Sequence, residues 1–291
     1  MSTVAFVHAH PDDEAIFSGG TILSLVERGH RVLLLVATGG ELGTMAAPDA
    51  SVPDRELDGA PPAAHAVGSN DTGRGAASAA PSGDRAEPLA PTRRRELDAA
   101  ATILGVHEVH HLGHLDSGMA GDPANHAPGS FFAADAHAVA ADVAEIFSSG
   151  GVDTVVVYDD HGVYGHPDHV QGHVVGLAAA ELAGIACRYE MTVDREYLHF
   201  VETHLVEEAA LGGDLGLAGS RIGTSSVEVD LTLDVRAHLG TKRRAMAAHR
   251  SQLPEHAPVF GLDPDRFAEV YGWEWYHRLG PRGVLDDLVA R

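Results

Sequence analysis

Apolar and polar residues follow two patterns along the first part of the chain. Residues 3–8 (TVAFVH) and 31–38 (RVLLLVAT) are nearly continuous apolar runs, which are typical of strands buried on both faces. Between them, residues 17–28 carry apolar side chains at helical spacing, and Gly29 follows as a residue type that commonly ends helices. Strand, helix and strand in this order predict the βαβ unit of a parallel sheet.

The same alternation returns in the middle of the chain. The pattern predicts helices and strands in turn, over residues 94–104 (helix), 106–112 (strand), 133–148 (helix), 152–158 (strand) and 167–183 (helix). We therefore expect an α/β fold in which residues 1–184 form a Rossmann-like, mostly parallel sheet with helices on both faces.

Beyond residue 184 the periodicity is less regular. Residues 226–233 alternate like a strand with one wet face, a helix can run from Asp234 to about residue 250, and residues 269–279 form an aromatic, strand-like end. We expect residues 185–291 to form a smaller α+β layer packed on the first part, without a linker, so that the chain is one structural domain.

A long segment interrupts this order. Residues 44–92 consist largely of Ala, Pro, Gly, Ser and Asp, and they cannot bury enough apolar surface to fold alone. A loop of this length inside a compact domain is usually either functional or disordered. Two interpretations follow, of which the sequence favours the first: a flap at the rim of an active site, or an inert insertion.

The charge balance excludes one class of partner. The 291 residues include 42 Asp and Glu against 20 Lys and Arg, which gives a net charge of −22 and argues against nucleic acid or an anionic membrane. No apolar run approaches the roughly 20 residues of a membrane span. No export signal precedes the first strand, and the single Cys187 cannot form an internal disulfide. We expect a cytoplasmic protein.

The first strand is followed by a dense group of polar residues. Residues 8–14 read H-A-H-P-D-D-E, where a dinucleotide-binding protein would have a glycine-rich turn for phosphate. Imidazoles and carboxylates crowded at a strand end are costly unless a cation binds there. His10 and a neighbouring Asp therefore form a plausible half of a metal site, and a solvated acidic turn that caps the next helix is the alternative.

A second polar group follows the strand at residues 152–158. His166 and His169 lie three residues apart at the start of a predicted helix. Because parallel strands end at the same edge of a sheet, we expect these residues to lie beside residues 10–14. Together the two segments predict a His-Asp-His ligand set with an open position for water, as in catalytic zinc sites.

Residues 107–111 (HEVHH) fit the H-E-x-x-H pattern of zinc proteases, which requires a helix. Here Gly105 ends the preceding helix, and the segment alternates like a strand. On a strand the outer histidines would lie roughly 13 Å apart, too far for one ion. We therefore interpret these residues as strand and surface histidines.

Several short motifs follow one another along the chain. They are residues 10–14 (HPDDE), 38–43 (TGGELG), 93–97 (RRREL), 115–119 (LDSGM) and 166–169 (HPDH). Together they resemble the PIG-L/LmbE-like de-N-acetylase family of metal-dependent amidases. The resemblance covers residues 3–184 in order and, more loosely, residues 242–252 (KRRAMAAHRSQ).

This resemblance implies a zinc-dependent de-N-acetylase with His10, Asp13 and His169 as metal ligands. A nitrogen and oxygen ligand set also suits Fe²⁺, so iron is the alternative metal. The resemblance further implies that Asp12 is the general base that deprotonates the metal-bound water.

The resemblance implies three further catalytic roles. His166 would be the cation that stabilises the oxyanion or protonates the departing amine, and Asp168 would orient it. Tyr164 could donate a hydrogen bond to the oxyanion. Water activation, carbonyl polarisation and proton delivery are the three requirements of amide hydrolysis, and each has a candidate residue.

The motif wording is similar to the actinobacterial branch of the family that acts in mycothiol metabolism. We expect hydrolysis of the N-acetyl amide of an N-acetylglucosaminyl-type small molecule, such as GlcNAc-inositol, with release of acetate and a free amine. Arg93 and Asp116 would contact sugar hydroxyls. The insertion, and residues 160–163 where that branch usually has a glycine pair, depart from the pattern.

Two alternatives therefore stay open for the function. One is an amidase for another N-acylated small molecule, such as a mycothiol S-conjugate or an antibiotic amino sugar. The other is a sugar-binding protein without catalysis. The sequence also leaves the formation of a homo-oligomer open.

Overall fold

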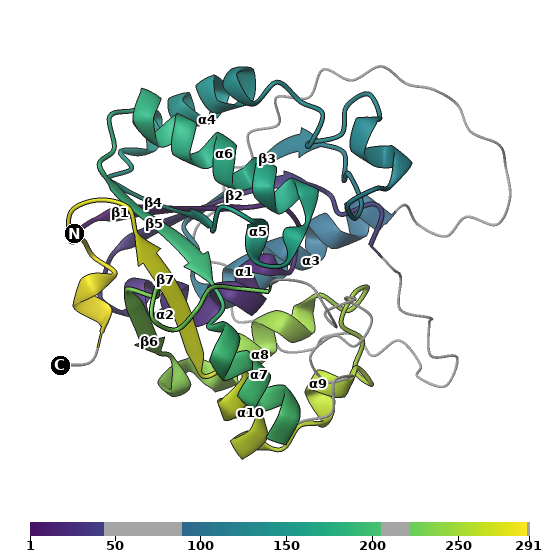
Figure 1. Ribbon diagram of the computed structural model, residues 1–291, viewed down its shortest axis with the longest axis vertical. Helices are drawn as coiled ribbons and strands as arrows, with labels where there is room; N and C mark the ends of the chain where they lie inside the picture. Colours follow the sequence, from purple (N-terminus) through teal and green to yellow (C-terminus); the bar gives the residue numbers. More distant parts are fainter. Residues whose placement is uncertain (44–88, 205–221, 290–291) are drawn as a thin grey trace, which may run out of the picture.

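The computed structural model describes residues 1–43, 89–204 and 222–289 of the chain. Its centre is a seven-stranded sheet with the order β3-β2-β1-β4-β5-β7-β6 (Figure 1). The strands are β1 Thr3–His8, β2 Arg31–Thr38, β3 Glu108–His114, β4 Thr154–Tyr158, β5 Cys187–Thr192, β6 Leu231–Asp234 and β7 Trp273–Arg278.

The strands β3, β2, β1, β4 and β5 are parallel, whereas β7 runs antiparallel to both β5 and β6. Strands β2 and β3 are added outward from β1 in one direction, and β4 and β5 in the other, with β7 inserted between β5 and the edge strand β6. The point of reversal lies between β1 and β4, and ligands of open α/β sheets bind outside the carboxyl ends of strands at such a point. The predicted α/β fold with a mostly parallel sheet is confirmed.

Helices cover both faces of the sheet. They are α1 Asp13–Phe17, α2 Gly19–Glu27, α3 Leu89–Leu104, α4 Ala136–Gly150, α5 Gly162–Gly165, α6 Pro167–Leu182, α7 Arg195–His204, α8 Leu239–Ala248, α9 Pro258–Gly261 and α10 Pro264–Tyr271. Short 3₁₀ turns are Pro123–His126, Arg236–His238 and Asp286–Leu288. No helix in these ranges is long and apolar enough to cross a membrane.

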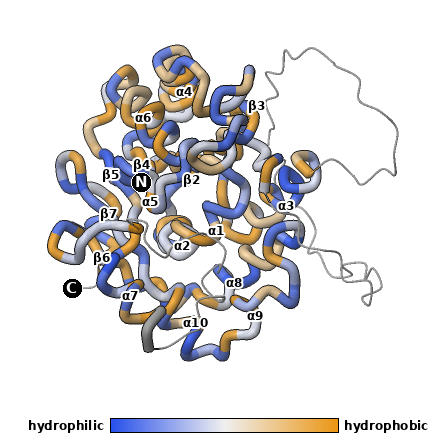
Figure 2. The backbone as a smooth tube through the Cα atoms, turned by 45° about the vertical axis from the view of Figure 1, so that its right-hand side comes forward, coloured by the Kyte–Doolittle hydropathy of each residue, from blue (hydrophilic) through white to orange (hydrophobic). Residues whose placement is uncertain are grey.

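Alternate residues of β1, β2 and β4 contribute to two separate cores. Along β1, Val4 and Phe6 belong to the core on one face, and Ala5 and Val7 to the core on the other. Helices α4 and α6 cover the second face, while α2, α3 and α8 lie on the first (Figure 1). Figure 2 shows apolar and polar positions mixed along α4 and α6, as expected for helices with one face on a sheet. Burial on both faces explains the continuous apolar runs in the sequence.

The first predicted helix is present with shorter bounds. We expected a helix over residues 17–28, and α2 covers Gly19–Glu27, while the short helix α1, which was not predicted, precedes it and is separated from it by a break at Ser18. Close packing explains the small residues after the break, because a Cβ atom on Gly20 would lie 2.3 Å from the Cβ atom of Val235. The helix therefore approaches the carboxy-terminal part at a distance that only glycine permits.

The second difference concerns the predicted insertion. Helix α3 begins at Leu89, so the last four residues of the segment 44–92 are helical, which corrects that boundary. Residues 44–88 lie outside the described residues, and the interpretation as a flap stays a prediction.

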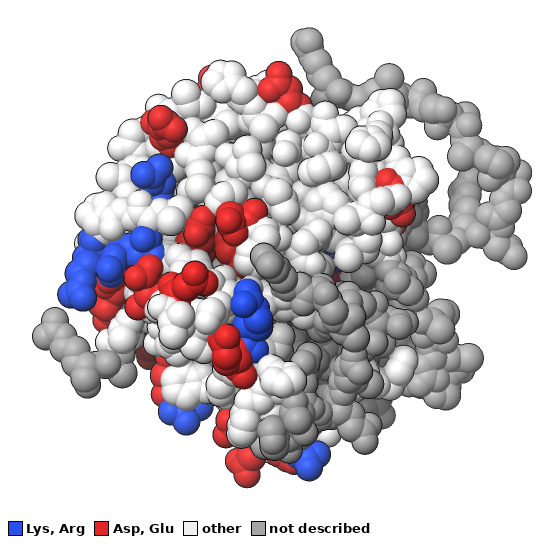
Figure 3. Space-filling model, in the orientation of Figure 1, with Lys and Arg blue, Asp and Glu red and all other residues white. Residues whose placement is uncertain are grey.

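The carboxy-terminal strands differ in extent from the predicted ones. Strand β6 covers residues 231–234, so only 231–233 of the predicted 226–233 are in a strand, and helix α10 takes the first part of the aromatic segment before β7. Both strands extend the main sheet through β5. On the face that Figure 3 shows, Asp and Glu side chains form several separate groups, some of them next to Lys or Arg.

Candidate metal centre and active site

The site forms where β1 and β4 end. After β1 the chain turns through Ala9 and Pro11 into α1, and after β4 it passes through α5 into α6. Pro167 occupies the first turn of α6, where its missing N–H is not needed, and His166 is the N-cap. His166 and His169, three apart at this helix start, therefore point to the same side. The predicted meeting of the two motifs is present.

Three polar atoms of this rim form an almost regular triangle. His10 Nδ1 lies 3.5 Å from Asp13 Oδ2, His169 Nε2 lies 3.4 Å from the same oxygen, and the two nitrogens are 3.3 Å apart. All three residues are buried. Tetrahedral zinc with ligands at about 2.0–2.2 Å separates its donor atoms by about 3.3–3.6 Å. The donor atoms thus fit one small divalent ion and leave a fourth position open.

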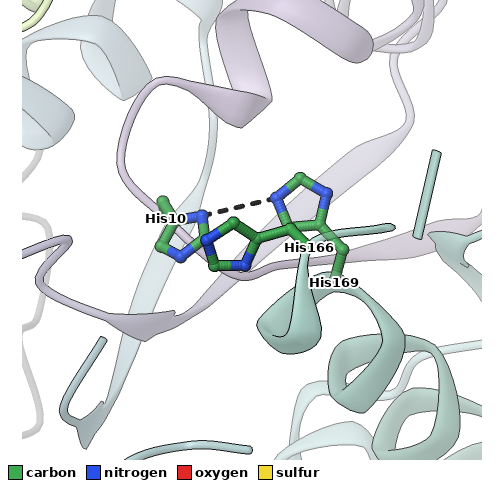
Figure 4. A group of neighbouring side chains, drawn as sticks. All are labelled: His10, His166 and His169. Atoms are coloured by element: carbon green, nitrogen blue, oxygen red, sulfur yellow. Dashed lines mark hydrogen bonds between the residues drawn. The ribbon is translucent and has the colours of Figure 1, made fainter. Parts of the chain in front are cut away.

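Figure 4 shows how three imidazoles converge at this place. His10 comes from the loop after β1, and His166 and His169 come from the start of α6. Their ring nitrogens lie within 4.8 Å of one another, a grouping that could hold a metal ion. The dashed line in Figure 4 joins His10 and His169, the pair of nitrogens in the triangle.

Tyr158, the last residue of β4, holds two of these side chains. Its hydroxyl donates to Asp13 Oδ2 at 2.6 Å and accepts the N–H of Ala9 at 2.7 Å. Its ring stacks on His169 with 4.0 Å between centroids and 14° between planes. Burial and the charge of Asp13 hold the pKa of Tyr158 well above its ordinary value, so the hydroxyl stays a donor.

Asp168 and Asp116 contact the other nitrogen of His10. His10 Nε2 is 3.2 Å from Asp168 Oδ2 and 3.7 Å from Asp116 Oδ1. We predicted that Asp168 orients His166, and the contact between them runs through the backbone: the Asp168 N–H donates to His166 Nδ1 at 3.2 Å. The second carboxylate oxygen of Asp168 is buried without a partner among the described residues.

Asp12 is held at an unusual backbone geometry. Its φ of 109° lies in the region that favours glycine, at a cost of about 1–3 kcal/mol. Its carboxylate Oδ2 is 3.2 Å from an Arg93 nitrogen, and 19% of its side chain is exposed. Burial raises the pKa of Asp12 to about 6, although the nearby charge of Arg93 opposes the rise.

Arg93 and Asp116, the two predicted sugar-binding residues, form hydrogen bonds to other groups of the protein. Arg93 is only 3% exposed and donates to the carbonyls of Gly40 and Pro11 as well as to Asp12. Asp116 is buried and accepts N–H groups from Leu42 and Gly118. In the described residues both therefore hold loops around the site.

Tyr164 and His166 border the open side of the triangle. Tyr164 is half-buried, its ring meets His169 edge-on at 4.9 Å, and its hydroxyl bonds to no residue in the described ranges. Burial lowers the pKa of His166 to about 3, and the rings of His10 and His169 add to this effect. At pH 7 His166 is therefore neutral here, with Nδ1 accepting from the backbone and Nε2 carrying the proton.

The loop before α6 is tightly packed and strained. Val163 has φ 63°, a conformation that valine rarely adopts, and its carbonyl accepts the N–H of Gly223. At Gly162 a Cβ atom would lie 2.7 Å from that of His169. Gly162 therefore permits close packing against α6, and Val163 keeps its conformation at the expense of backbone strain.

The H-E-x-x-H segment is a strand, as expected. Residues 108–114 form β3 at the edge of the sheet, and His110 Nε2 lies 3.2 Å from Glu108 Oε2. His107 Nδ1 accepts the N–H of Val32. These histidines have local partners and do not converge.

Sequence comparisons support the motif interpretation. Residues 5–180 match the PIG-L family, described as GlcNAc-PI de-N-acetylase. The chain is 33% identical to a 1D-myo-inositol 2-acetamido-2-deoxy-alpha-D-glucopyranoside deacetylase of Thermobispora bispora, over 94% of this chain and 86% of the relative. A protein of the same name from Thermomonospora curvata is 34% identical, over 96% and 91% of the two chains.

Solved structures share the fold. The N,N'-diacetylchitobiose deacetylase of Pyrococcus horikoshii superposes with a TM-score of 0.53 at 21% identity, covering 96% of this chain and 84% of that one. At this level of identity the likeness concerns the fold alone.

Proposed function

Because the chain belongs to the PIG-L family of de-N-acetylases, we propose that it hydrolyses the N-acetyl amide of an N-acetylglucosaminyl small molecule to acetate and a free amine. The observation that carries the proposal is the triangle of His10 Nδ1, Asp13 Oδ2 and His169 Nε2, with edges of 3.3–3.5 Å. Its dimensions match the ligand set of a catalytic zinc site with one open position.

In this proposal His10, Asp13 and His169 hold Zn²⁺, and Fe²⁺ is the alternative because the same donor set suits both metals. The ion supplies Lewis-acid polarisation of the amide carbonyl and makes water nucleophilic at neutral pH. Tyr158 and Asp168 orient the ligands, since a hydrogen bond to a ligand fixes its direction and tunes its basicity.

Asp12 is the proposed general base. Its carboxylate is partly exposed at the site, and its raised pKa of about 6 lies close to neutral pH, where a base combines ionisation with proton affinity. It takes the proton of the attacking water. Arg93 restrains this carboxylate and the loop behind it, so we assign Arg93 a positioning role before any contact with sugar.

His166 and Tyr164 are the proposed hydrogen-bond donors to the reacting amide. A neutral His166 with its proton on Nε2 can stabilise the developing oxyanion, a role that does not need the cation we predicted. The hydroxyl of Tyr164, two residues before His166 in the same loop, can act as a second hydrogen-bond donor. The leaving nitrogen needs one proton, and the proton that Asp12 takes from water balances it when Asp12 returns it to that nitrogen, directly or through His166.

The proposed substrate class rests on the relatives from Thermobispora bispora and Thermomonospora curvata, which are named as deacetylases of a GlcNAc-inositol. We propose GlcNAc-inositol as the first substrate to test, and a reaction in the cytoplasm on a soluble molecule. The net charge of −22 disfavours polyanionic partners.

The test is acetate release by the purified chain from GlcNAc-inositol, free N-acetylglucosamine and an N-acylated thiol conjugate, with and without a chelator. We expect the highest kcat/KM on GlcNAc-inositol, loss of activity in the chelator and recovery with added Zn²⁺ or Fe²⁺. Preference for the thiol conjugate would point to the alternative amidase. A folded, metal-loaded protein that binds sugars and releases no acetate would contradict the proposal.

A further inference from the structure

Glu14 and His249 form a buried pair that the roles above leave unexplained. Glu14 lies in α1 and His249 directly follows α8, 235 positions later in the chain. Both are 0% exposed, and His249 Nε2 is 2.6 Å from Glu14 Oε1. Removing two such groups from water is costly and seldom adds stability, so the pair calls for a specific use.

The other oxygen of Glu14 points to that use. Glu14 Oε2 accepts the backbone N–H of Asp12 at 3.0 Å. This is the peptide of the residue whose φ of 109° departs from ordinary backbone. A strained residue persists only where its surroundings hold it, and such residues are common at active sites.

Four hydrogen bonds hold the turn at Asp12. Its carbonyl accepts the N–H groups of Ala15 and Ile16, Arg93 binds the preceding carbonyl of Pro11, and Glu14 binds its N–H. Of these, only the Glu14 contact is itself held by a partner from the carboxy-terminal part. His249 fixes the direction of the Glu14 carboxylate and, through it, the peptide that carries Asp12.

A second buried pair on α8 shows what a purely structural role looks like. Lys242 Nζ lies 2.6 Å from Glu274 Oε1, and Glu274 accepts the N–H groups of Gly20 and Thr21 at 2.8 Å each. That carboxylate caps the start of α2, where unpaired N–H groups need an acceptor. Lys242 lies within α8 and His249 directly follows it, seven residues later, yet only the Glu14–His249 pair bonds to the proposed base.

We propose that His249 is a positioning residue that acts through Glu14 to hold Asp12 in its strained conformation, with its carboxylate at the site. The inference rests on the proposed function of Asp12 as general base. It assigns a catalytic consequence to the carboxy-terminal motif at residues 242–252, which contributes none of the proposed ligands or proton donors.

Two substitutions at one position test the geometry. His249→Gln places an N–H donor where Nε2 is, whereas His249→Asn places it near Nδ1, which has no partner in the described residues. Misplacement of a catalytic group by about 1 Å can cost about 100-fold in rate. We expect His249→Asn to lower kcat by at least about tenfold with KM and zinc content unchanged, and His249→Gln to keep kcat within about threefold.

Two further variants separate positioning from stability. Lys242→Met removes the other buried pair, so we expect it to lower Tm by at least as much as His249→Asn while kcat stays unchanged. Glu14→Asp shortens the carboxylate by one methylene and should reproduce the loss in kcat, which provides a second route if His249→Asn does not fold.

A double-mutant cycle gives the decisive readout. If His249 acts through Asp12, His249→Asn should cause little further loss in a protein that already carries Asp12→Asn. An equal loss in both backgrounds, or equal kcat for the two His249 variants, would overturn the inference. A wild-type protein inactive on every substrate would instead contradict the proposed function, so the two failures are distinguishable.

Discussion

Two regions of this protein are rich in histidine and carboxylate, and only one of them builds a site. At the ends of β1 and β4, donor atoms from segments more than 150 residues apart meet within 3.5 Å and are buried. On β3, histidines of the H-E-x-x-H segment lie along one edge strand with neighbours such as Glu108 as partners. The difference is convergence, which the topology provides at the point where the strand order reverses.

The comparison also separates motif from context. H-E-x-x-H makes a metal site only where helical spacing brings its histidines to one face. H-P-D-D-E and H-P-D-H make one here because parallel strands carry both to the same edge. Burial then decides the chemistry, since removal from water strengthens the interaction of a carboxylate or imidazole with a cation.

The largest effect should come from Asp12→Asn. The amide keeps the size of the side chain and cannot accept the proton of water, so we expect kcat to fall by about 10²–10⁴-fold. Metal content should stay at the wild-type value because Asp12 lies outside the donor triangle. Asp160→Asn, at a side chain that is 83% exposed, is the matched control and should leave kcat unchanged. Full activity of the Asp12 variant would remove the proposed base.

The next effect concerns the support of the metal ligands. Tyr158→Phe keeps the ring that stacks on His169 and removes the hydroxyl that donates to Asp13. Loss of such a partner typically weakens metal binding by about 10–100-fold, so chelator competition should show a weaker Kd for Zn²⁺. Tyr276→Phe is the control. It removes a buried hydroxyl of β7 that donates to Thr21 of α2, and it should change the stability of the protein and leave its Zn²⁺ affinity unchanged. Equal Zn²⁺ affinity in both variants would contradict the role of Tyr158.

A smaller effect, on stability, is expected at Glu190. Acidic and histidine side chains also gather around this residue, but they do not form a triangle of donor atoms like that of the proposed metal site. Burial and the charges of Asp159 and Asp160 raise the pKa of Glu190 to about 7, although the charge of His161 favours its charged form. A raised folded-state pKa means that stability present at low pH is lost as pH rises toward 7.

Glu190→Gln removes this titration. At about 1.4 kcal/mol per pKa unit, a shift from 4.5 to about 7 makes the variant more stable than wild type by up to about 3 kcal/mol at pH 8, with the difference vanishing near pH 4. Tm measured across this range checks it, with the exposed Glu145→Gln as control. A difference in Tm between Glu190→Gln and wild type that is the same at all pH values would show that ionisation of Glu190 does not destabilise the folded protein.

The parts of the fold that could be predicted from the sequence are those set by local pattern. Strands β1, β2 and β4 are nearly continuous apolar runs because both faces are covered, and Pro167 after an N-cap histidine marks the start of α6. The proximity of the H-P-D-D-E and H-P-D-H segments followed from the parallel order alone. These inferences needed no contact between distant residues.

The parts that could not be predicted depend on pairing across the chain. Tyr158 reads as the apolar end of a strand, and only the structure shows its hydroxyl on Asp13, 145 residues away. Glu14 and His249 are 235 residues apart. The close approach of Gly20 in α2 to Val235 joins residues 215 positions apart. Sequence periodicity reports which face is buried and carries no information on which partner buries it.

The central claim is that His10, Asp13 and His169 form one metal site, and zinc content per chain tests it most directly. After reconstitution with Zn²⁺ and dialysis, wild type and His110→Ala should each retain one ion, whereas His169→Ala should retain none. All three proteins should have the same fold by circular dichroism. A His169→Ala protein that keeps its zinc with unchanged affinity, or a wild type that binds none, would contradict the account.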